Sequence, residues 1–261
     1  MKLNFFNLNQ LDNNLIILIC IFFIGLLIGS FLNVLIYKIP RKINIFKPYS
    51  ICFNCRKPQS LLFSFPILSF LFKKNKCDNC NNKIFTQNFL IEILNALIYV
   101  LIYLIFGFNV KTFTGLILTS ILLVISFIDL EFMIIPNIII LPFTIVGLII
   151  NIAININSWW LPFVFSISGF IFMFIVHLIY PKGMGMGDVK LTLMLGAFLV
   201  KDIIFALFAG FILGAIAGII LIIIKRKTVK QFIPFGPFLS AGAMMAFFIG
   251  DIVAKWYLKT L

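Results

Sequence analysis

Ionisable side chains are scarce in this chain, and several common kinds of enzyme site are absent with them. Of 261 residues, 11% are charged, eight are acidic and one is histidine. A single histidine excludes the His-Glu-x-x-His motif of zinc proteases. A membrane serine protease needs Gly-x-Ser-Gly and a histidine partner, but Ser166 stands where that motif would have glycine before Ser168-Gly169. No Gly-Lys-Ser/Thr phosphate loop is present.

What the chain has in excess is hydrophobic residues. They make up 62% of the sequence, and the mean hydropathy is +1.17. A soluble core does not need this much apolar surface, whereas long apolar runs are typical of membrane-spanning helices. The first run begins near Leu15 and lacks a small-residue cleavage site, so we expect a retained helix and not a removable signal peptide.

Apolar runs of helical length predict an all-α polytopic membrane protein with about eight transmembrane helices. Short polar turns on one side and longer segments on the other separate these helices. The run at 189–200 is short enough to be tilted, half-buried or merged with its neighbour. The predicted spans are 15–37, 89–106, 112–129, 134–154, 159–180, 189–200, 203–224 and 238–257.

Basic residues predict the orientation of these helices. Sixteen of the 21 lysines and arginines fall in three segments, 38–88, 181–190 and 225–231, which the predicted spans place on the same side of the membrane. By the positive-inside rule, that side is cytoplasmic. The net charge of +13 therefore indicates topology. It argues against nucleic-acid binding, because the charges lie beside membrane ends.

Four of the five cysteines form two Cys-x-x-Cys pairs within residues 38–88. The pairs are Cys52 with Cys55 and Cys77 with Cys80. Two such pairs can supply four thiolates to a tetrahedral zinc ion, and a cytoplasmic position disfavours disulfides. We predict a structural zinc that stabilises a small loop-rich domain and has no open coordination position for catalysis. The alternative is a set of reduced or redox-active pairs.

Two of the acidic residues lie where a membrane enzyme could use them. Asp129 ends the apolar run in ISFIDLEFMIIPN, and Asp188 begins the next run after a glycine-rich segment. The predicted topology brings both to the cytoplasmic membrane boundary, and ionisable groups at membrane depth are usually functional. Two neighbouring carboxylates share a proton, so one can activate a water while the other donates to a carbonyl. The pair therefore predicts an aspartic peptidase.

The segment PKGMGMGDVK at 181–190 indicates how a peptide would reach Asp188. Glycines let an extended backbone approach closely because they have no Cβ. Gly185 and Gly187 are therefore predicted to lie next to the substrate. Lys190 is a candidate for orienting or neutralising a carboxylate, and the alternative for this residue is simple anchoring at the membrane surface.

Structural alternatives stay open for the acidic residues and the histidine. Asp188 could be a helix N-cap, and Asp129 could be an interfacial acid. His177 is expected to be packed or hydrogen-bonded. A transporter or channel that uses membrane carboxylates for ion or proton coupling is an alternative from a different functional class. Against it, both aspartates are predicted at one boundary, and no inverted repeat is visible.

Six sequence motifs are distributed over residues 25–245. They are GSFLNVLIYKIP at 29–40, the paired Cys-x-x-Cys sequences, Glu92, IDLEFMIIPN at 128–137, GMGDVK at 185–190 and IPFGPFLSAGA at 233–243. In this order they resemble the motifs of the bacterial type IV prepilin peptidases, which are membrane aspartic peptidases with a Gly-x-Gly-Asp motif. Gly-x-Gly-Asp alone is a weak signature, whereas six motifs in one order are specific.

The resemblance implies a leader peptidase that is also an N-methyltransferase. Asp129 and Asp188 would be the catalytic pair that cleaves prepilin and pseudopilin precursors, the substrates of type IV pilus and type II secretion systems. The family also methylates the new N-terminus with S-adenosylmethionine. Gly29, Asn33 and Glu92 are the candidate residues for that reaction. A membrane aspartic peptidase that acts on another substrate without methyl transfer is the alternative.

These predictions divide the chain into three parts. Residues 1–37 hold an N-terminal segment and the first transmembrane helix, residues 38–88 form a cytoplasmic zinc-binding domain with four cysteine ligands, and residues 89–261 form a transmembrane aspartic peptidase domain. The expected location is the bacterial inner membrane, with the zinc domain and the active site facing the cytoplasm. The expected partners are prepilin and pseudopilin precursors and the lipid bilayer, with no nucleic acid. The sequence assigns no oligomeric state.

Overall fold

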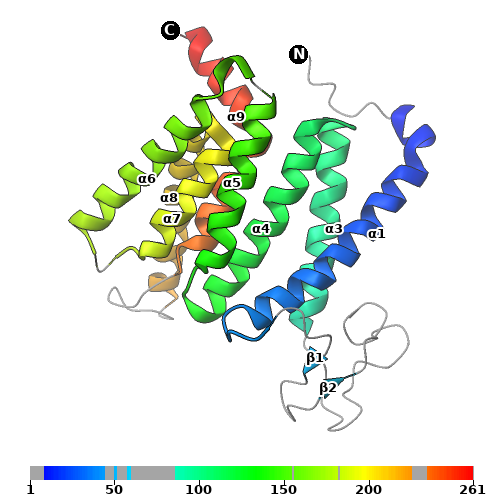
Figure 1. Ribbon diagram of the computed structural model, residues 1–261, viewed down its shortest axis with the longest axis horizontal. Helices are drawn as coiled ribbons and strands as arrows, with labels where there is room; N and C mark the ends of the chain where they lie inside the picture. Colours follow the sequence, from blue (N-terminus) through cyan, green and yellow to red (C-terminus); the bar gives the residue numbers. More distant parts are fainter. Residues whose placement is uncertain are drawn as a thin grey trace. The chain divides into compact units, whose positions relative to one another are not determined.

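The structure is a computed structural model, shown in Figure 1. It describes residues 9–44, 50–51, 58–59, 86–154, 156–181, 183–224 and 234–260. The chain divides into two compact units, Met1–Val124 and Ile125–Leu261. Each unit is described by itself.

The described part of the first unit consists of long helices and one short strand pair. Its elements are α1 (Asn9–Lys38), β1 (Ser50–Ile51), β2 (Pro58–Gln59), α3 (Thr86–Phe106) and the part of α4 (Val110–Phe132) that precedes residue 125. β1 and β2 pair antiparallel, with Ser50 opposite Gln59. The apolar runs form helices because a helix satisfies its own backbone hydrogen bonds, which lipid cannot do.

Small residues bring α1 and α3 close together. A Cβ added at Gly25 would lie 2.6 Å from the Cα of Ala96, and one added at Gly29 would lie 2.7 Å from the Cα of Glu92. The two glycines are four residues apart, which is the spacing of small residues in closely packed transmembrane helices. Asn95 adds a polar contact, because its Nδ2 donates to the carbonyl oxygen of Gly25 at 2.8 Å. Close backbone packing and hydrogen bonding therefore hold this pair of helices.

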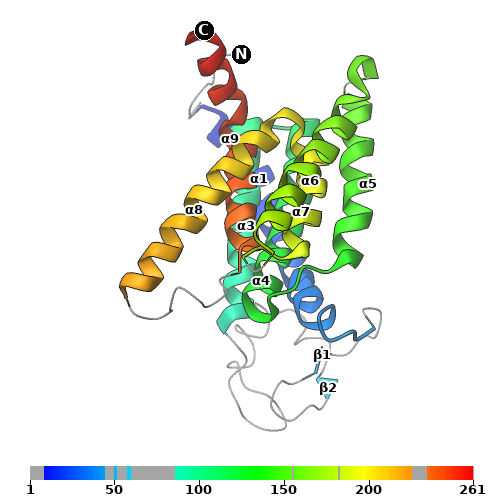
Figure 2. The ribbon, with the colours of Figure 1, turned by 90° about the vertical axis from the view of Figure 1, so that its left-hand side faces the viewer.

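The second unit contains the end of α4 and a bundle of further helices, which Figure 2 shows from a second direction. Pro142 lies inside the first of these helices, and Pro162 lies in the first turn of the next. The described elements are α5 (Asn137–Ile154), η2 (Ile156–Ser158), α6 (Leu161–Ile179), α7 (Met186–Leu199), η3 (Val200–Asp202), α8 (Ile203–Ile223) and α9 (Gly236–Thr260).

α7 is the central helix of the second unit. It packs against α5, α6 and α9, and most of its residues are buried. A Cβ at Gly196 would lie 2.5 Å from the Cα of Ser166, so α6 can approach only a glycine here. Asn151 on α5 donates its Nδ2 to the carbonyl oxygens of Ala197 at 2.8 Å and Phe198 at 3.1 Å. These contacts hold the C-terminal half of α7 against α5 and α6. The first turn of α7 belongs to the same helix and is therefore held with it.

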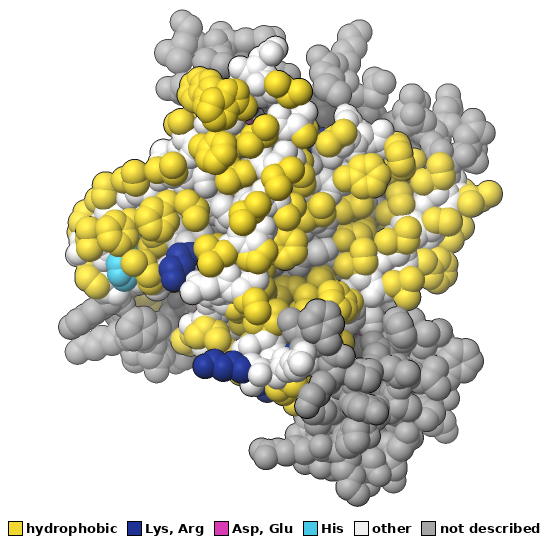
Figure 3. Space-filling view, viewed as in Figure 1, with side chains coloured by type: hydrophobic (Ala, Val, Ile, Leu, Met, Phe, Trp, Pro, Cys, Tyr) yellow, Lys and Arg dark blue, Asp and Glu magenta, His cyan; other side chains and the backbone are white. Residues whose placement is uncertain are grey.

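The surface of the described residues is largely apolar. Figure 3 shows hydrophobic side chains over most of the described part of one face. Six segments of the described residues are long and apolar enough to cross a membrane. Trp159 and Trp160 are exposed just before α6, and tryptophan is enriched at membrane–water interfaces. The chain is a multi-pass membrane protein.

The eight predicted spans correspond to six candidate spans among the described residues, so a count of eight crossings is not confirmed. Each predicted span falls on a helix, but α7 has 14 residues. At 1.5 Å per residue it is roughly 21 Å long, which is shorter than the hydrocarbon core. α7, η3 and α8 therefore form one candidate stretch, Met186–Ile223, and the apolar part of α9, Gly236–Gly250, is also shorter than a full span.

The three-part division of the chain stays a prediction. Both predicted boundaries, after residues 37 and 88, fall inside the first unit. Most of residues 38–88 lies outside the described residues; residues 38–44, the two short strands and the start of α3 are the described parts.

Candidate active site

Asp129 lies one turn before the end of α4. The helix ends at Phe132, and Met133 follows with a positive φ of 54°. The N–H of Met133 donates to the carbonyl oxygen of Asp129 at 2.9 Å, which satisfies one of the last carbonyls of the helix. The Asp129 side chain is 5% exposed, and its Oδ2 accepts the backbone N–H of Gly236 at 2.9 Å. Asp129 is therefore buried, and its carboxylate is bound by the backbone at the start of α9.

Asp188 lies in the first turn of α7, where Gly185 is the N-cap residue. The N–H of Gly185 donates to Oδ2 of Asp188 at 3.3 Å, and the N–H of Asp188 donates to the carbonyl oxygen of Gly185 at 3.1 Å. The side chain is 7% exposed, and its Oδ1 is buried without a hydrogen-bond partner among the described residues. Buried polar atoms rarely lack a partner. This oxygen is therefore available to a proton, a water molecule or a substrate group.

The two carboxylates lie close enough for their charges to interact. Each has one oxygen bound by a glycine amide at the beginning of a helix: Gly236 for Asp129 and Gly185 for Asp188. The N-terminal end of a helix dipole stabilises negative charge at such a position. A pair of this kind can hold one proton and one negative charge between its two members, which is the requirement for attack by an activated water.

The glycine-rich segment before Asp188 is attached to its neighbours on two sides. Nδ1 of His177 on α6 forms a hydrogen bond with the carbonyl oxygen of Met184 at 2.8 Å. A Cβ added at Gly187 would lie 3.0 Å from the Cβ of Ile135, which follows α4. The predicted hydrogen-bonded role of His177 thus corresponds to a contact that holds the segment against α6. Gly185 is exposed, and Gly187 is half-buried.

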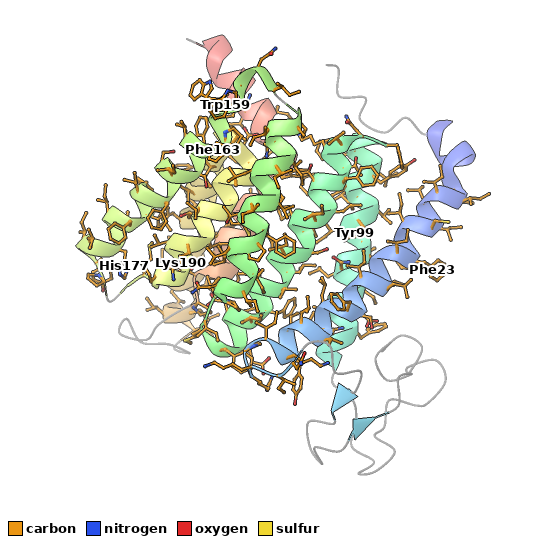
Figure 4. All side chains as sticks on the ribbon, viewed as in Figure 1. Phe23, Tyr99, Trp159, Phe163, His177 and Lys190 are labelled. Atoms are coloured by element: carbon orange, nitrogen blue, oxygen red, sulfur yellow. The ribbon has the colours of Figure 1, made fainter. Side chains whose placement is uncertain are left out.

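Lys190 lies two residues after Asp188, at the same end of α7. Its Nζ donates to Oδ1 of Asn137 at 3.2 Å, so it connects the first turns of α7 and α5. Figure 4 labels Lys190 on α7 and His177 near the end of α6, both on the left of the view. The observed partner of Lys190 is thus the side-chain amide of Asn137.

The residues predicted for methyl transfer come together in the first unit. Nδ2 of Asn33 donates to Oε1 of Glu92 at 3.4 Å, and the backbone of Glu92 lies directly against Gly29. Glu92 is 1% exposed and Asn33 is 9% exposed. The three residues therefore form one buried polar cluster between α1 and α3.

Two further residues belong to these sites and were not predicted as site residues. Asn95 is completely buried, one turn after Glu92 on the same face of α3. The sequence does contain a pattern that indicates Asn95 as a site residue, because Glu92 and Asn95 are two polar residues three positions apart and share one face of an otherwise apolar helix. Gly236 lies within the motif at 233–243, but its contact with Asp129 spans 107 residues of sequence. No local pattern predicts such a contact.

The predicted zinc site falls outside the described residues. Cys52, Cys55, Cys77 and Cys80 all lie there. Among the residues whose positions are described, no group of three or more histidine, cysteine, aspartate or glutamate side chains could hold a metal ion. The fifth cysteine, Cys20, is free and exposed on α1.

Comparison with known proteins matches both parts of the chain. The family model described as bacterial peptidase A24 N-terminal domain matches residues 23–106, and the one described as type IV leader peptidase family matches residues 116–219. The second match includes Asp129 and Asp188, and the first includes Gly29, Asn33 and Glu92.

Several curated relatives are similar over nearly their whole length. A protein of Bacillus subtilis (strain 168) named prepilin leader peptidase/N-methyltransferase is 32% identical over 243 residues, which cover 92% of this chain and 97% of the relative. Proteins of the same name from Aeromonas salmonicida (strain A449) and Neisseria gonorrhoeae are each 30% identical. The matched regions cover 92% and 90% of this chain and 94% and 92% of those proteins, respectively. No solved structure matches the chain.

Proposed function

The chain belongs to the type IV leader peptidase family, and from this membership we propose that it cleaves the leader peptide of type IV prepilins and pseudopilins and then methylates the new N-terminus. The chain is a membrane peptidase and N-methyltransferase of that family. The observation that carries the peptidase proposal is the pair of interacting, buried carboxylates at Asp129 and Asp188.

In the proposed reaction the two aspartates share the acid and base roles. One carboxylate is ionised and removes a proton from a water molecule, whose oxygen then attacks the carbonyl carbon of the scissile peptide. The other carboxyl group is protonated and donates its proton to the carbonyl oxygen. The unpartnered, buried Oδ1 of Asp188 supports this scheme, because among the described residues it is a free position for the water or the substrate carbonyl.

The position of the aspartates suits a substrate with a basic leader followed by an apolar helix. Asp129 lies in the last turn of α4 and Asp188 in the first turn of α7, at the ends of apolar helices and not at their centres. A prepilin inserted in the membrane presents its cleavage site at such a boundary. Gly185 and Gly187 leave room for an extended peptide beside Asp188. The excess of basic residues supports an inner-membrane location with this end in the cytoplasm.

We assign methyl transfer to the buried cluster of the first unit, with S-adenosylmethionine as the methyl donor. That cofactor carries a positively charged sulfonium group, and the acceptor is an α-amine. The carboxylate of Glu92 suits the sulfonium cation, and it also suits the protonated form of the amine, which must lose a proton before it can accept the methyl group. Asn33 holds that carboxylate through its Nδ2. Gly29 permits close approach of α1 to the backbone of Glu92. Asn33 and Glu92 therefore fit the sulfonium group of the cofactor or the protonated amine of the acceptor.

We also propose that Cys52, Cys55, Cys77 and Cys80 hold a structural zinc ion, on the spacing of the two pairs. Metal analysis of the purified full chain is expected to find about one zinc per molecule by this ligand count. Cys52→Ser should lose most of it, whereas Cys20→Ser, a change at an exposed cysteine on α1, should retain it. Equal zinc content in both variants would contradict the assignment.

The experiment that tests the function is incubation of the purified protein with a synthetic prepilin N-terminus, with and without S-adenosylmethionine, followed by mass spectrometry. The expected products are a cleaved peptide in both conditions and an additional methyl group when the cofactor is present. Asp129→Asn and Asp188→Asn should each abolish cleavage, because a neutral amide can neither accept nor donate the required proton.

Asp202→Asn is the matched control for these substitutions. Asp202 is an aspartate of the same unit in η3, after the C-terminal end of α7 and away from its first turn. This variant should cleave at the rate of the parent. If a variant that carries both Asp129→Asn and Asp188→Asn still cleaves the peptide, the proposed mechanism is excluded. If the parent protein does not cleave the synthetic prepilin N-terminus, that peptide is excluded as a substrate.

A further inference from the structure

We propose that Gly236 is a positioning residue for peptide cleavage: its backbone amide holds one oxygen of Asp129, and its lack of a side chain leaves room for that oxygen. The inference rests on the proposed function, in which Asp129 is one of the two catalytic carboxylates. The proposed role of the start of α9 is to position Asp129, and the sequence motif at 233–243 does not by itself indicate that role.

The hydrogen bonds at the N-terminus of α9 single out the amide of Gly236. The first N–H groups of a helix have no partner within it. Here the N–H groups of Phe238 and Leu239 both donate to the carbonyl oxygen of Phe235, each at 3.1 Å. Pro237 has no N–H. Gly236 therefore carries the one amide of this turn that is directed to Asp129, and it donates to Oδ2 at 2.9 Å.

The space beside Gly236 is occupied by Asp129 itself. A Cβ added at Gly236 would lie 2.7 Å from Oδ2, 3.1 Å from Cγ and 3.3 Å from Cβ of Asp129. All three nearest atoms thus belong to the carboxylate side chain. Any residue other than glycine would displace the group that the amide binds. The requirement for glycine at this position follows from the proximity of Asp129 and not from the conformation of the helix.

The start of α9 is in turn anchored on α8. The rings of Phe235 and Phe211 lie 5.3 Å apart between centroids. A Cβ added at Gly214 would lie 3.1 Å from a ring carbon of Phe235, and one added at Gly210 would lie 3.1 Å from the Cα of Leu239. α8 therefore fixes the position of the Gly236 amide, and the amide fixes the direction of the carboxylate.

This arrangement makes the two aspartates unequal. Asp129 is held by an amide from a distant helix, whereas Asp188 is held by the amide of its own N-cap and keeps a buried oxygen without a partner among the described residues. With Oδ2 of Asp129 fixed, its carboxylate plane cannot turn freely toward or away from Asp188. Reaction rates are sensitive to such placement, since a displacement of about 1 Å can lower a rate by roughly 100-fold.

Gly236→Ala tests the proposal in the full-length protein. Because a partly unfolded preparation would also lose activity, the binding-competent fraction is first titrated with a non-cleavable prepilin peptide, and kcat is expressed per bound site. We expect kcat per site to fall by about tenfold to 100-fold, with KM changed by less than about threefold. The matched control is Gly250→Ala at the other end of α9, whose Cβ would lie 2.7 Å from Cγ of Asp202 and would not meet Asp129; it should keep kcat per site within about twofold of the parent.

A second variant separates the hydrogen bond from the steric effect. Semisynthesis of the full chain with glycolic acid in place of Gly236 replaces the N–H with an ester oxygen and adds no atom beside Asp129. We expect kcat per site to fall by about tenfold, in line with the loss of one hydrogen bond to a charged group. If Gly236→Ala fails to bind peptide, the kcat per site of the ester variant still tests whether the Gly236 amide positions Asp129.

The outcomes distinguish this inference from the proposed function. If the ester variant retains kcat per site within about twofold of the parent, Gly236 does not position Asp129, although the two-aspartate mechanism can still hold. If the parent protein does not cleave the peptide, or Asp129→Asn still cleaves it, the proposed function itself fails. An equal loss of kcat per site in Gly250→Ala and Gly236→Ala would assign Gly236 a packing role only.

Discussion

Both units of this protein bury polar side chains among apolar helices, but they satisfy those side chains differently. In the first unit, Glu92 accepts from Asn33, and Asn95 donates to a backbone carbonyl of the opposite helix. In the second unit, Asp129 and Asp188 accept from glycine amides at two helix N-termini, and one oxygen of Asp188 has no partner among the described residues. The first arrangement joins two helices, and the buried Oδ1 of Asn95 has no partner among the described residues. The second brings two carboxylates together and keeps an oxygen of one of them open.

The comparison teaches that burial alone does not identify a reactive acid. Glu92 is as well buried as either aspartate, at 1% exposure against 5% for Asp129 and 7% for Asp188. The two aspartates lie close enough for their charges to interact, and each accepts a hydrogen bond from a glycine amide. A buried polar group in a membrane protein is usually functional or paired, and its hydrogen-bond partners indicate which of the two roles it has.

The largest expected effect tests whether the two polar regions act independently. In Asp188→Asn, prepilin cleavage should fall by about 10³-fold or more, because an acid–base partner is lost. Methylation of a peptide supplied already cleaved should remain within about threefold of the parent, since Glu92 is unchanged. Both rates are measured by mass spectrometry on the same preparation. Loss of both activities would show that the two regions cannot be separated.

The reciprocal substitution, Glu92→Gln, should affect methyl transfer and spare cleavage. Removing the charge from a hydrogen-bonded carboxylate should lower methyl transfer by about 10- to 100-fold. Cleavage should stay within about threefold. Glu131→Gln, at an exposed residue near the end of α4, is the matched control and should leave methyl transfer unchanged. A larger loss of cleavage than of methylation would reverse the assignment of the two sites.

A smaller effect is expected from the packing of α1 on α3. Gly25→Val would place its Cβ 2.6 Å from the Cα of Ala96, and such overpacking costs about 1–3 kcal/mol. Thermal unfolding in detergent, followed by circular dichroism, should show a Tm lower by about 2–8 °C. Leu27→Ala, on the exposed face of α1, should change the Tm by less than about 2 °C. Equal shifts in the two variants would show that the glycine contact does not hold these helices.

The smallest expected effect concerns Lys190. Lys190→Met removes the hydrogen bond to Asn137 and a positive charge two residues from Asp188. Because Lys190 lies near the surface, we expect KM for the prepilin peptide to rise by only about two- to fivefold, with kcat nearly unchanged. Lys201→Met, at an exposed lysine after the other end of α7, should leave both constants unchanged. If Lys190→Met lowered kcat as much as Asp188→Asn does, Lys190 would have to be a catalytic residue.

Much of the helix pattern could be predicted from the sequence, and some of the site could not. Apolar runs predicted a helix for each proposed span, because a helix satisfies its backbone hydrogen bonds within its own segment and lipid offers no partners. The division into crossings was less predictable, since α7 has 14 residues and continues through η3 into α8. The zinc domain stays a prediction, because its cysteines lie outside the described residues.

Within the sites, polar residues in apolar helices were visible as candidates, and their partners were not. Asp129, Asp188, Glu92 and Asn33 stand out because an acid or an amide is costly at membrane depth. Asn95 could have been included, three positions after Glu92. The role of Gly236 was not predictable, because it depends on a carboxylate 107 residues earlier in the chain.

The sequence by itself determined that this protein is helical and membrane-embedded, and it determined which few polar groups enter the apolar region, because composition and spacing act through local physical chemistry. Only the tertiary structure decided which amide holds each carboxylate and which carboxylate oxygen stays open. Those outcomes depend on where the ends of separate helices meet, and packing between distant segments determines that meeting.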